Sequence, residues 1–216
     1  MWELLLPIFG FSIGTIASMT GIGGGVFIVP LLTLIYGFYP AHAVGTSLTT
    51  IIFTSLASTA NYSRQKRIYY KIGLILAITT APGALLGAYL TSIVSPRMLG
   101  LIFGFFILFV ALHMIVNFYS IRRKGLVKEK DTSSLLVSSE GELFGSRTKV
   151  LQSAALSFFG GLASGLLGIG GGVLIVPIMN LAMVMPIHIA VATSMCTMIF
   201  TSISGVIQHF SLGNIR

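Results

Sequence analysis

The sequence predicts an all-α protein that crosses a lipid bilayer several times. Of its 216 residues, 55% are hydrophobic and 8% are charged, and the mean hydropathy is +0.96, far above that of a soluble domain. Runs such as 72–94 exceed the length of about 18 apolar residues that is typical of a transmembrane helix. A glycine-broken apolar segment also occurs twice, which predicts that the helices form two homologous repeats.

The repeated segment reads Gly-Ile-Gly-Gly-Gly-Val-x-Ile-Val-Pro and occupies residues 21–30 and 168–177. At this offset of 147 residues, the similarity continues without a gap to residues 68 and 215, with roughly 20 of about 48 positions identical. Shared hydrophobicity alone does not produce such identity. We therefore interpret the two stretches as an internal duplication.

The apolar runs and the turn residues between them predict the elements in order. The first repeat, residues 1–120, is expected to hold a broken segment at 4–37, a helix at 43–61, a basic loop, and a hairpin of helices at 72–94 and 98–119. The polar stretch 121–149 has too few large apolar groups to fold alone, so we expect a cytoplasmic linker. The second repeat, residues 150–216, restarts with a broken segment and a helix at 189–210 but lacks its last hairpin. Either the protein is truncated or split, or a homo-oligomer or a second subunit supplies that hairpin.

The net charge of +8 indicates orientation and not a nucleic-acid partner, because the basic residues cluster in the loop at 64–71 and in the linker. Such loops stay on the cytoplasmic side, so we expect a multi-pass protein of the cell (inner) membrane with its basic loops inside. With both loops inside, each broken segment is counted as one net outward crossing. This count predicts that both repeats run in the same direction, with His42 and His188 on the outer side.

The clustered glycines predict a binding site, because an interrupted helix is tolerated in a bilayer only where it faces a cavity or buried protein. Glycine permits positive φ, and helices restarting at Val26 and Val173 would point free N–H groups at the gap. A helix N-terminus binds anions without a cationic side chain. The predicted substrate-binding residues offer backbone or hydroxyl donors: Gly23, Gly24, Gly25, Thr46, Ser47, Gly170, Gly171, Gly172, Thr193 and Ser194.

Two alternatives assign these residues structural roles. The glycines could serve only close helix packing. The hydroxyls of a second group could bond to a carbonyl one turn earlier: Thr54, Ser55, Thr201 and Ser202. Two copies of the same constellation favour a site, because packing glycines need no Val-Pro and Thr-Ser partners.

The acidic residues argue against a cation substrate. All five lie outside the apolar runs, whereas cation-coupled carriers commonly hold their cation on an intramembrane carboxylate. His113, within the run at 98–119, is the candidate for proton coupling. Cys196 is the only cysteine, and we expect neither a metal nor a cofactor.

The stretch Gly-x-Gly-Gly-Gly-x-x-x-Val-Pro, followed by a small residue and Thr-Ser at 45–47 and 192–194, resembles the TauE/SafE sulfite exporter family. The resemblance implies a permease, not an enzyme, for small anions that are sulfur-containing (sulfite, thiosulfate, organosulfonate) or carboxylated. Typical members look to have two four-helix halves.

Two other functions stay open. One is a non-transporting membrane subunit or scaffold. The other is an intramembrane hydrolase with Ser164 as nucleophile and His188 or His209 as base. The duplication disfavours the hydrolase, because it places Ala17 opposite Ser164.

Overall fold

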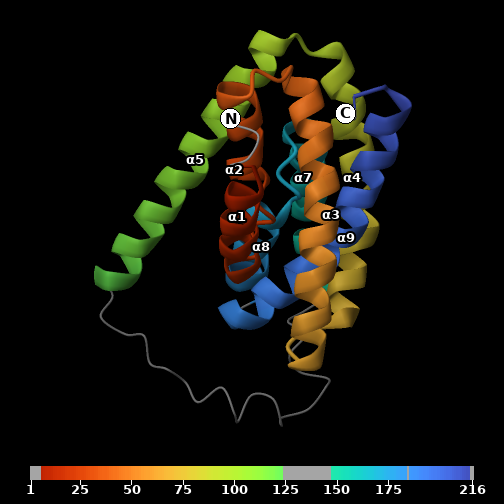
Figure 1. Ribbon diagram of the computed structural model, residues 1–216. Helices are drawn as coiled ribbons and strands as arrows, with labels where there is room; N and C mark the ends of the chain where they lie inside the picture. The colour runs from red at the N-terminus through yellow and green to blue at the C-terminus, as the bar shows by residue number, and fades with distance from the viewer. Residues whose placement is uncertain (1–5, 124–146, 184, 215–216) are drawn as a thin grey trace.

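The computed structural model describes residues 6–123, 147–183 and 185–214, and its regular elements there are helices (Figure 1). In chain order they are α1 (Leu6–Thr20), α2 (Gly25–Pro30), the π-helical turn η2 (Leu31–Ile35), α3 (Pro40–Arg64), α4 (Tyr70–Ile93), α5 (Pro96–Arg123), α7 (Arg147–Leu167), α8 (Gly172–Ala182) and α9 (Ile187–Ser211). Within these residues, three helices are long and apolar enough to cross a membrane, namely α3, α4 and α9. The prediction of an all-helical membrane protein is confirmed.

The predicted helices correspond to observed ones with small shifts at their ends. The helices expected at 43–61 and 189–210 are α3 and α9, and the expected hairpin is α4 and α5. Proline opens α3 at its first position, where a fixed φ and a missing N–H cost nothing. The linker at 121–149 falls mostly outside the described residues, as does the side chain of His113, so both remain predictions.

The direction of each helix can be followed in Figure 1. We call the end where α4 meets α5 the hairpin end, and the end where α5 stops and α7 begins the linker end. Helix α3 runs toward the linker end, and α4, α7 and α9 run back toward the hairpin end. Contacts agree: Gly83 and Gly87 of α4 lie against Phe158 and Leu162 of α7, in the same order along both helices. Helices α3 and α9 are antiparallel, since Leu48 near the start of α3 lies against the end of α9 at Gly205.

Each broken segment turns back inside the molecule. Helix α1 runs toward the linker end and α2 returns, whereas α7 runs toward the hairpin end and α8 returns (Figure 1). The predictions of one net crossing per segment, and of two repeats with the same direction, are therefore wrong. Helices α1 and α7 both end directly before a glycine break, at Thr20 and Leu167, and the chain reverses there in both halves.

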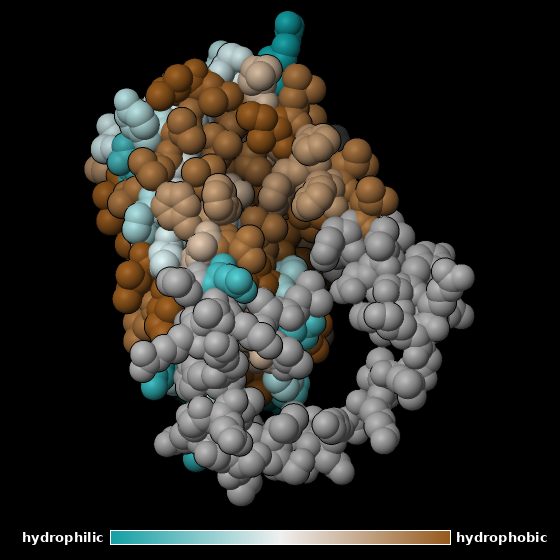
Figure 2. All heavy atoms as spheres, turned by 180° about the vertical axis from the view of Figure 1, so that it is seen from behind, coloured by the Kyte–Doolittle hydropathy of each residue, from teal (hydrophilic) through white to brown (hydrophobic). Residues whose placement is uncertain are grey.

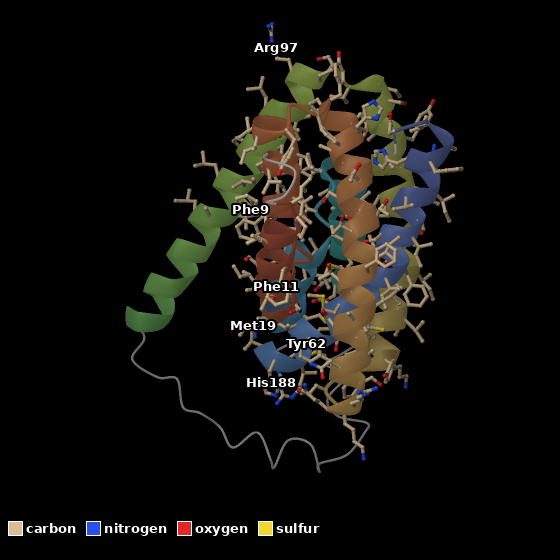
Figure 3. The ribbon with its side chains drawn as sticks, in the orientation of Figure 1. Phe9, Phe11, Met19, Tyr62, Arg97 and His188 are labelled. Atoms are coloured by element: carbon tan, nitrogen blue, oxygen red, sulfur yellow. The ribbon has the colours of Figure 1, made fainter. Side chains whose placement is uncertain are left out.

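The reversal also corrects the expected position of the histidines at the helix starts. His188 lies at the linker end of the molecule (Figure 3). His42 belongs to the first turn of α3, which begins at the hairpin end. The two residues therefore lie on opposite sides, and not together on the outer side.

Helix α4 packs against the second half of the chain. A Cβ on Gly83 would overlap the carbonyl oxygen of Phe158, and one on Gly161 would overlap that of Thr80. Gly165 meets the carbonyl of Ala84 in the same way. Small residues let two membrane helices approach to backbone contact, so the packing role applies to this set of glycines.

The outer surface suits a lipid environment. Hydrophobic residues cover most of the described face in Figure 2, and large apolar side chains such as Phe11, Leu34 and Phe105 are more than two-thirds exposed. Arg97 marks the hairpin end, opposite His188 (Figure 3). An apolar belt with polar groups at both ends is the pattern that a membrane-spanning bundle requires.

Candidate functional site

The two glycine segments, 21–25 and 168–172, lie side by side in opposite directions; we call this arrangement the glycine crossing. A Cβ on Gly25 would overlap the carbonyl oxygen of Gly168 and lie 2.7 Å from the Cα of Ile169. At the other end of the crossing, a Cβ on Gly172 would overlap the carbonyl oxygen of Gly21. The two breaks therefore meet through their backbones.

Left-handed glycines start both returning helices. Gly24 (φ 88°) caps α2 and Gly171 (φ 82°) caps α8, and an L-residue in this conformation costs about 1–2 kcal/mol. Each glycine carbonyl accepts two N–H bonds of 3.0–3.1 Å from the first turn that follows: Phe27 and Ile28 bond to Gly24, and Leu174 and Ile175 bond to Gly171. The two helix starts have the same geometry at the same offset.

Several N–H groups of the buried glycines at the crossing have no backbone acceptor. Within the described part of the chain, the N–H groups of Gly23, Gly24, Gly170 and Gly171 donate to no backbone carbonyl. A helix N-terminus carries roughly half a positive charge, and two of them begin here. The arrangement can therefore hold an anion by backbone dipoles.

The residues that the structure describes include no carboxylate to oppose that positive potential. The five acidic residues of the sequence all fall outside the residues that the structure describes. The basic residues that it does describe lie in loops or at helix ends, for example Arg64 at the end of α3 and Arg97 at the hairpin end. The crossing therefore contains neither a formal negative nor a formal positive side-chain charge.

Two equivalent serines tie the halves together. The hydroxyl of Ser47 on α3 donates to the carbonyl oxygen of Gly168 at 2.8 Å. The hydroxyl of Ser194 on α9 donates to that of Gly21 at 3.2 Å and to Val191 at 2.8 Å. Both serines are fully buried. Their hydroxyl hydrogens are used within the protein, where they fix the crossing against α3 and α9.

The neighbouring threonines differ from each other. The hydroxyl oxygen of Thr193 accepts the N–H of Tyr69 at 3.1 Å, just before α4 begins. The hydroxyl of Thr46, at the equivalent position of the first half, is buried and has no hydrogen-bond partner. In the described residues, the Thr46 hydroxyl therefore makes no hydrogen bond, whereas the Thr193 hydroxyl accepts one and keeps its hydrogen for donation.

Of the four other hydroxyls, three have the structural role that the alternative interpretation assigns and one does not. The hydroxyls of Thr54, Ser55 and Thr201 donate to carbonyls three or four residues earlier, as the structural alternative predicts. The hydroxyl of Ser202 is buried without a partner.

Two apolar side chains that the sequence did not single out close the crossing from the side of α3 and α9. The sulfur of Met198 lies 2.8 Å from the position that a Cβ on Gly23 would take. Ile51, the equivalent residue of α3, lies 3.0 Å from the same position on Gly170. Both side chains are fully buried. Their equivalent positions in the two repeats were the only available signal.

A hydrolytic Ser–His pair is not formed. The hydroxyl of Ser164 has no hydrogen-bond partner. The Nε2 of His209 lies 3.1 Å from the carbonyl oxygen of Gly165, and His188 lies at the linker end. The serine therefore lacks the base that nucleophilic catalysis requires.

Comparison with known proteins also indicates a membrane transporter. The family model for sulfite exporter TauE/SafE matches residues 6–216. The chain belongs to this family. It is 33% identical to the probable membrane transporter protein YunE of Bacillus subtilis (strain 168), over 99% of this chain and 80% of that protein.

More distant relatives of this TauE/SafE protein carry similar descriptions. The probable membrane transporter protein MJ0441 of Methanocaldococcus jannaschii is 29% identical, over 96% of this chain and 73% of that protein. The probable membrane transporter protein YdhB of Bacillus subtilis is 29% identical, over 97% and 80% respectively. No solved structure matches the chain. The protein is thus a multi-pass membrane protein from a family of probable transporters.

Proposed function

We propose that this chain is a secondary transporter or facilitator for small anions, and that the glycine crossing is its binding site. The observation that carries the proposal is the meeting of two left-handed helix starts, each with free N–H groups, among residues that include no carboxylate. The donors are the backbone of Gly23–Gly25 and Gly170–Gly172, supplemented by the hydroxyl of Thr46. The substrates are sulfite, thiosulfate, organosulfonates or small carboxylates.

The opposite directions of the two halves support a transport role. Duplicated halves of opposite direction, with broken helices that meet near the middle of the membrane, are typical of secondary transporters. Equivalent bonds link the halves, since Ser47 holds Gly168 and Ser194 holds Gly21. A pair of equivalent halves around one site can open alternately to the two sides of the membrane.

Flux in proteoliposomes tests the site. The purified protein is expected to move labelled sulfite, thiosulfate or methanesulfonate, and Gly24→Val and Gly171→Val are expected to abolish this flux while the protein still inserts. Both substitutions place a β-branched residue at φ above 80° and fill the space beside the free N–H groups. Gly104→Val on α5 is the matched control, because nothing lies within 4 Å of a Cβ there.

The outcomes separate the candidate functions. Normal flux in both site variants would place the solute elsewhere. A wild-type protein that folds and inserts but moves none of these anions would favour a non-transporting subunit or scaffold. Hydrolytic activity that Ser164→Ala removes would restore the hydrolase.

Proton coupling through His113 belongs to the same proposal. If the residue carries the coupled proton, His113→Gln abolishes uptake that is driven by a pH gradient and leaves exchange of labelled for unlabelled anion intact. Unchanged gradient-driven uptake would exclude it.

We further propose that the linker end faces the cytoplasm, because the basic loop between α3 and α4 and the ends of α5 and α7 share that end. In intact cells, a membrane-impermeant maleimide is expected to label Arg97→Cys but not Lys66→Cys. The native Cys196 is buried, so its background is low. The reverse pattern would invert the orientation.

The partner proposal rests on an uncovered face of α1 and α3. In the second half, α4 covers the equivalent face. It contacts Gly161, and the N–H of Tyr69, just before α4, donates to the hydroxyl oxygen of Thr193. The position in the first half that is equivalent to Gly161 is Gly14, where nothing lies within 4 Å of a Cβ. We propose that a helix of the α4 type, from a second subunit, covers this face.

A bulky substitution on this face tests the partner. Gly14→Phe is expected to leave the thermal stability of the isolated chain unchanged, because the position is open, and to abolish flux by excluding the partner helix. Gly104→Phe adds the same bulk to another open position and is expected to change neither. Normal flux in Gly14→Phe would mean that lipid covers the face, and cross-linking between copies through Phe11→Cys would make the partner a second copy.

A further inference from the structure

The two helix starts at the crossing have the same backbone but different side-chain neighbours. Beside Gly24, the Cβ of Ala17 lies 3.2 Å from the position that a glycine Cβ would take. Beside Gly171, the neighbour is Ser164, with its Cβ 3.6 Å from the equivalent position. Ala17 and Ser164 are themselves equivalent at the offset of 147 residues. The duplication therefore provides a methyl group at one helix start and a hydroxymethyl group at the other.

The Ser164 hydroxyl is an unpaired polar group in the interior. The residue is 0% exposed, and its Oγ has no hydrogen-bond partner. Other hydroxyls in these helices return to a carbonyl one turn earlier, as Thr33 and Ser58 do at 2.8 and 2.7 Å. A buried hydroxyl without a partner is destabilising unless a bound group pairs with it. Its position beside a helix start whose N–H groups have no backbone acceptor favours an anion as that group.

Two further hydroxyls extend from Ser164 toward the linker end of α7. Ser153 and Ser157 are also 0% exposed and without partners. The spacings of four and seven residues place all three serines on one face of the helix. The equivalent positions on α1 are Leu6, Gly10 and Ala17, which carry no hydroxyl.

We propose that a small oxyanion binds at the N-terminus of α8, not symmetrically between the two helix starts, with Ser164 donating a hydrogen bond to one of its oxygens. Ser157 and Ser153 then form a polar path from this site toward the linker end. The inference rests on the proposed anion transport and deepens it. Ser164 then fixes where the solute's oxygen lies, and the polar path predicts that the solute arrives from the linker end.

Exchange of the two equivalent residues tests the proposal. Sulfite is the probe, with chloride as the reference anion, and the readouts are the KM of flux and the sulfite-dependent rise in Tm of the purified protein. Ser164→Ala is expected to raise the KM about tenfold or more, which corresponds to about 1.4 kcal/mol. Its Tm without sulfite is expected to equal or exceed that of the wild type, because the substitution removes an unpaired buried hydroxyl.

The matched control is Ala17→Ser, which places a hydroxyl at the other helix start and is expected to leave the KM of the wild type within about twofold. The double exchange Ala17→Ser/Ser164→Ala is expected to keep the raised KM of Ser164→Ala. Recovery of the wild-type KM in the double variant would show that the two helix starts are interchangeable and would overturn the one-sided site.

Two further outcomes distinguish failure of the Ser164 site from failure of the transport proposal. A lowered Tm in Ser164→Ala without sulfite, with an unchanged KM, would make the serine structural and overturn this inference while anion transport stands. Wild-type protein with neither sulfite flux nor a sulfite-dependent Tm shift would overturn the transport proposal and this inference together.

Discussion

The backbone contact at the glycine crossing predicts a large loss of stability for two substitutions that add a single methyl group. Gly25→Ala and Gly172→Ala each place a Cβ onto a carbonyl oxygen of the other segment. Neither obstacle is a flexible side chain that can rotate away, so the two segments must separate. Both glycines have ordinary helical φ, so any effect comes from the contact and not from a forbidden backbone conformation.

The magnitude follows from three contributions. Overpacking a rigid site costs about 1–3 kcal/mol, and separation of the segments weakens the bond between Ser47 and Gly168, which contributes about 1 kcal/mol. Against this, replacing glycine by alanine in a helix stabilises the protein by up to about 1 kcal/mol through helix propensity. The net loss is about 3 kcal/mol at the upper end. For a chain of this size, each kcal/mol shifts Tm by about 2–4 °C, so we expect a fall of about 6–12 °C.

Thermal unfolding of the detergent-purified protein measures this directly. Gly104→Ala is the control, since nothing lies within 4 Å of a Cβ there, and it is expected to leave Tm unchanged or raise it by a few degrees. The variant Gly25→Ala/Gly172→Ala is expected to lose less than the sum of the single losses, because one substitution already opens the crossing for the other. A Tm for Gly25→Ala equal to that of Gly104→Ala would refute the backbone contact.

Three further predictions concern the same region. Ser47→Ala and Ser194→Ala are each expected to lower stability by about 1–3 kcal/mol, because each leaves a buried glycine carbonyl without its partner; two equal losses in denaturation would support equivalent roles, and no loss would contradict the observed bonds. Met198→Ala is expected to lower stability by about 2–5 kcal/mol and to accelerate anion flux by opening the side of the crossing that the methionine closes; slower flux would contradict that closing role. Gly161→Ala is expected to separate α7 from α4 and to lower Tm more than Gly104→Ala does, because its Cβ would meet the backbone of Thr80.

The sequence predicted the elements and their partners better than their directions. Apolar length located α3, α4, α5 and α9, and the duplicated glycines predicted that the two breaks would meet. Direction failed because hydropathy cannot distinguish a broken segment that crosses from one that turns back. That difference depends on the direction that the chain takes after the glycines, which is fixed only in the fold by the backbone contact between the segments 21–25 and 168–172.

The hydroxyl roles were predictable only in part. A Thr-Ser pair after the glycines was recognisable, but the sequence cannot tell a hydroxyl that binds a solute from one that binds a distant carbonyl. Ser47 and Gly168 lie 121 residues apart, and only the fold brings them together. Ser164 was a candidate nucleophile in the sequence, and its equivalent Ala17 argued against that role. The same difference now supports a binding role, since the structure gives the serine no base.

Equivalent contacts in the two halves are made by different side chains. The hydroxyl of Tyr62 at the end of α3 donates to the carbonyl oxygen of Ser18 at 2.9 Å. In the other half, His209 at the end of α9 makes the same contact with Gly165 at 3.1 Å. The backbone partners are conserved by the geometry of the fold, so substitution at such positions changes chemistry without changing the architecture. The two halves therefore differ in side-chain chemistry at a few equivalent positions, such as tyrosine against histidine and alanine against serine, on backbones that make equivalent contacts.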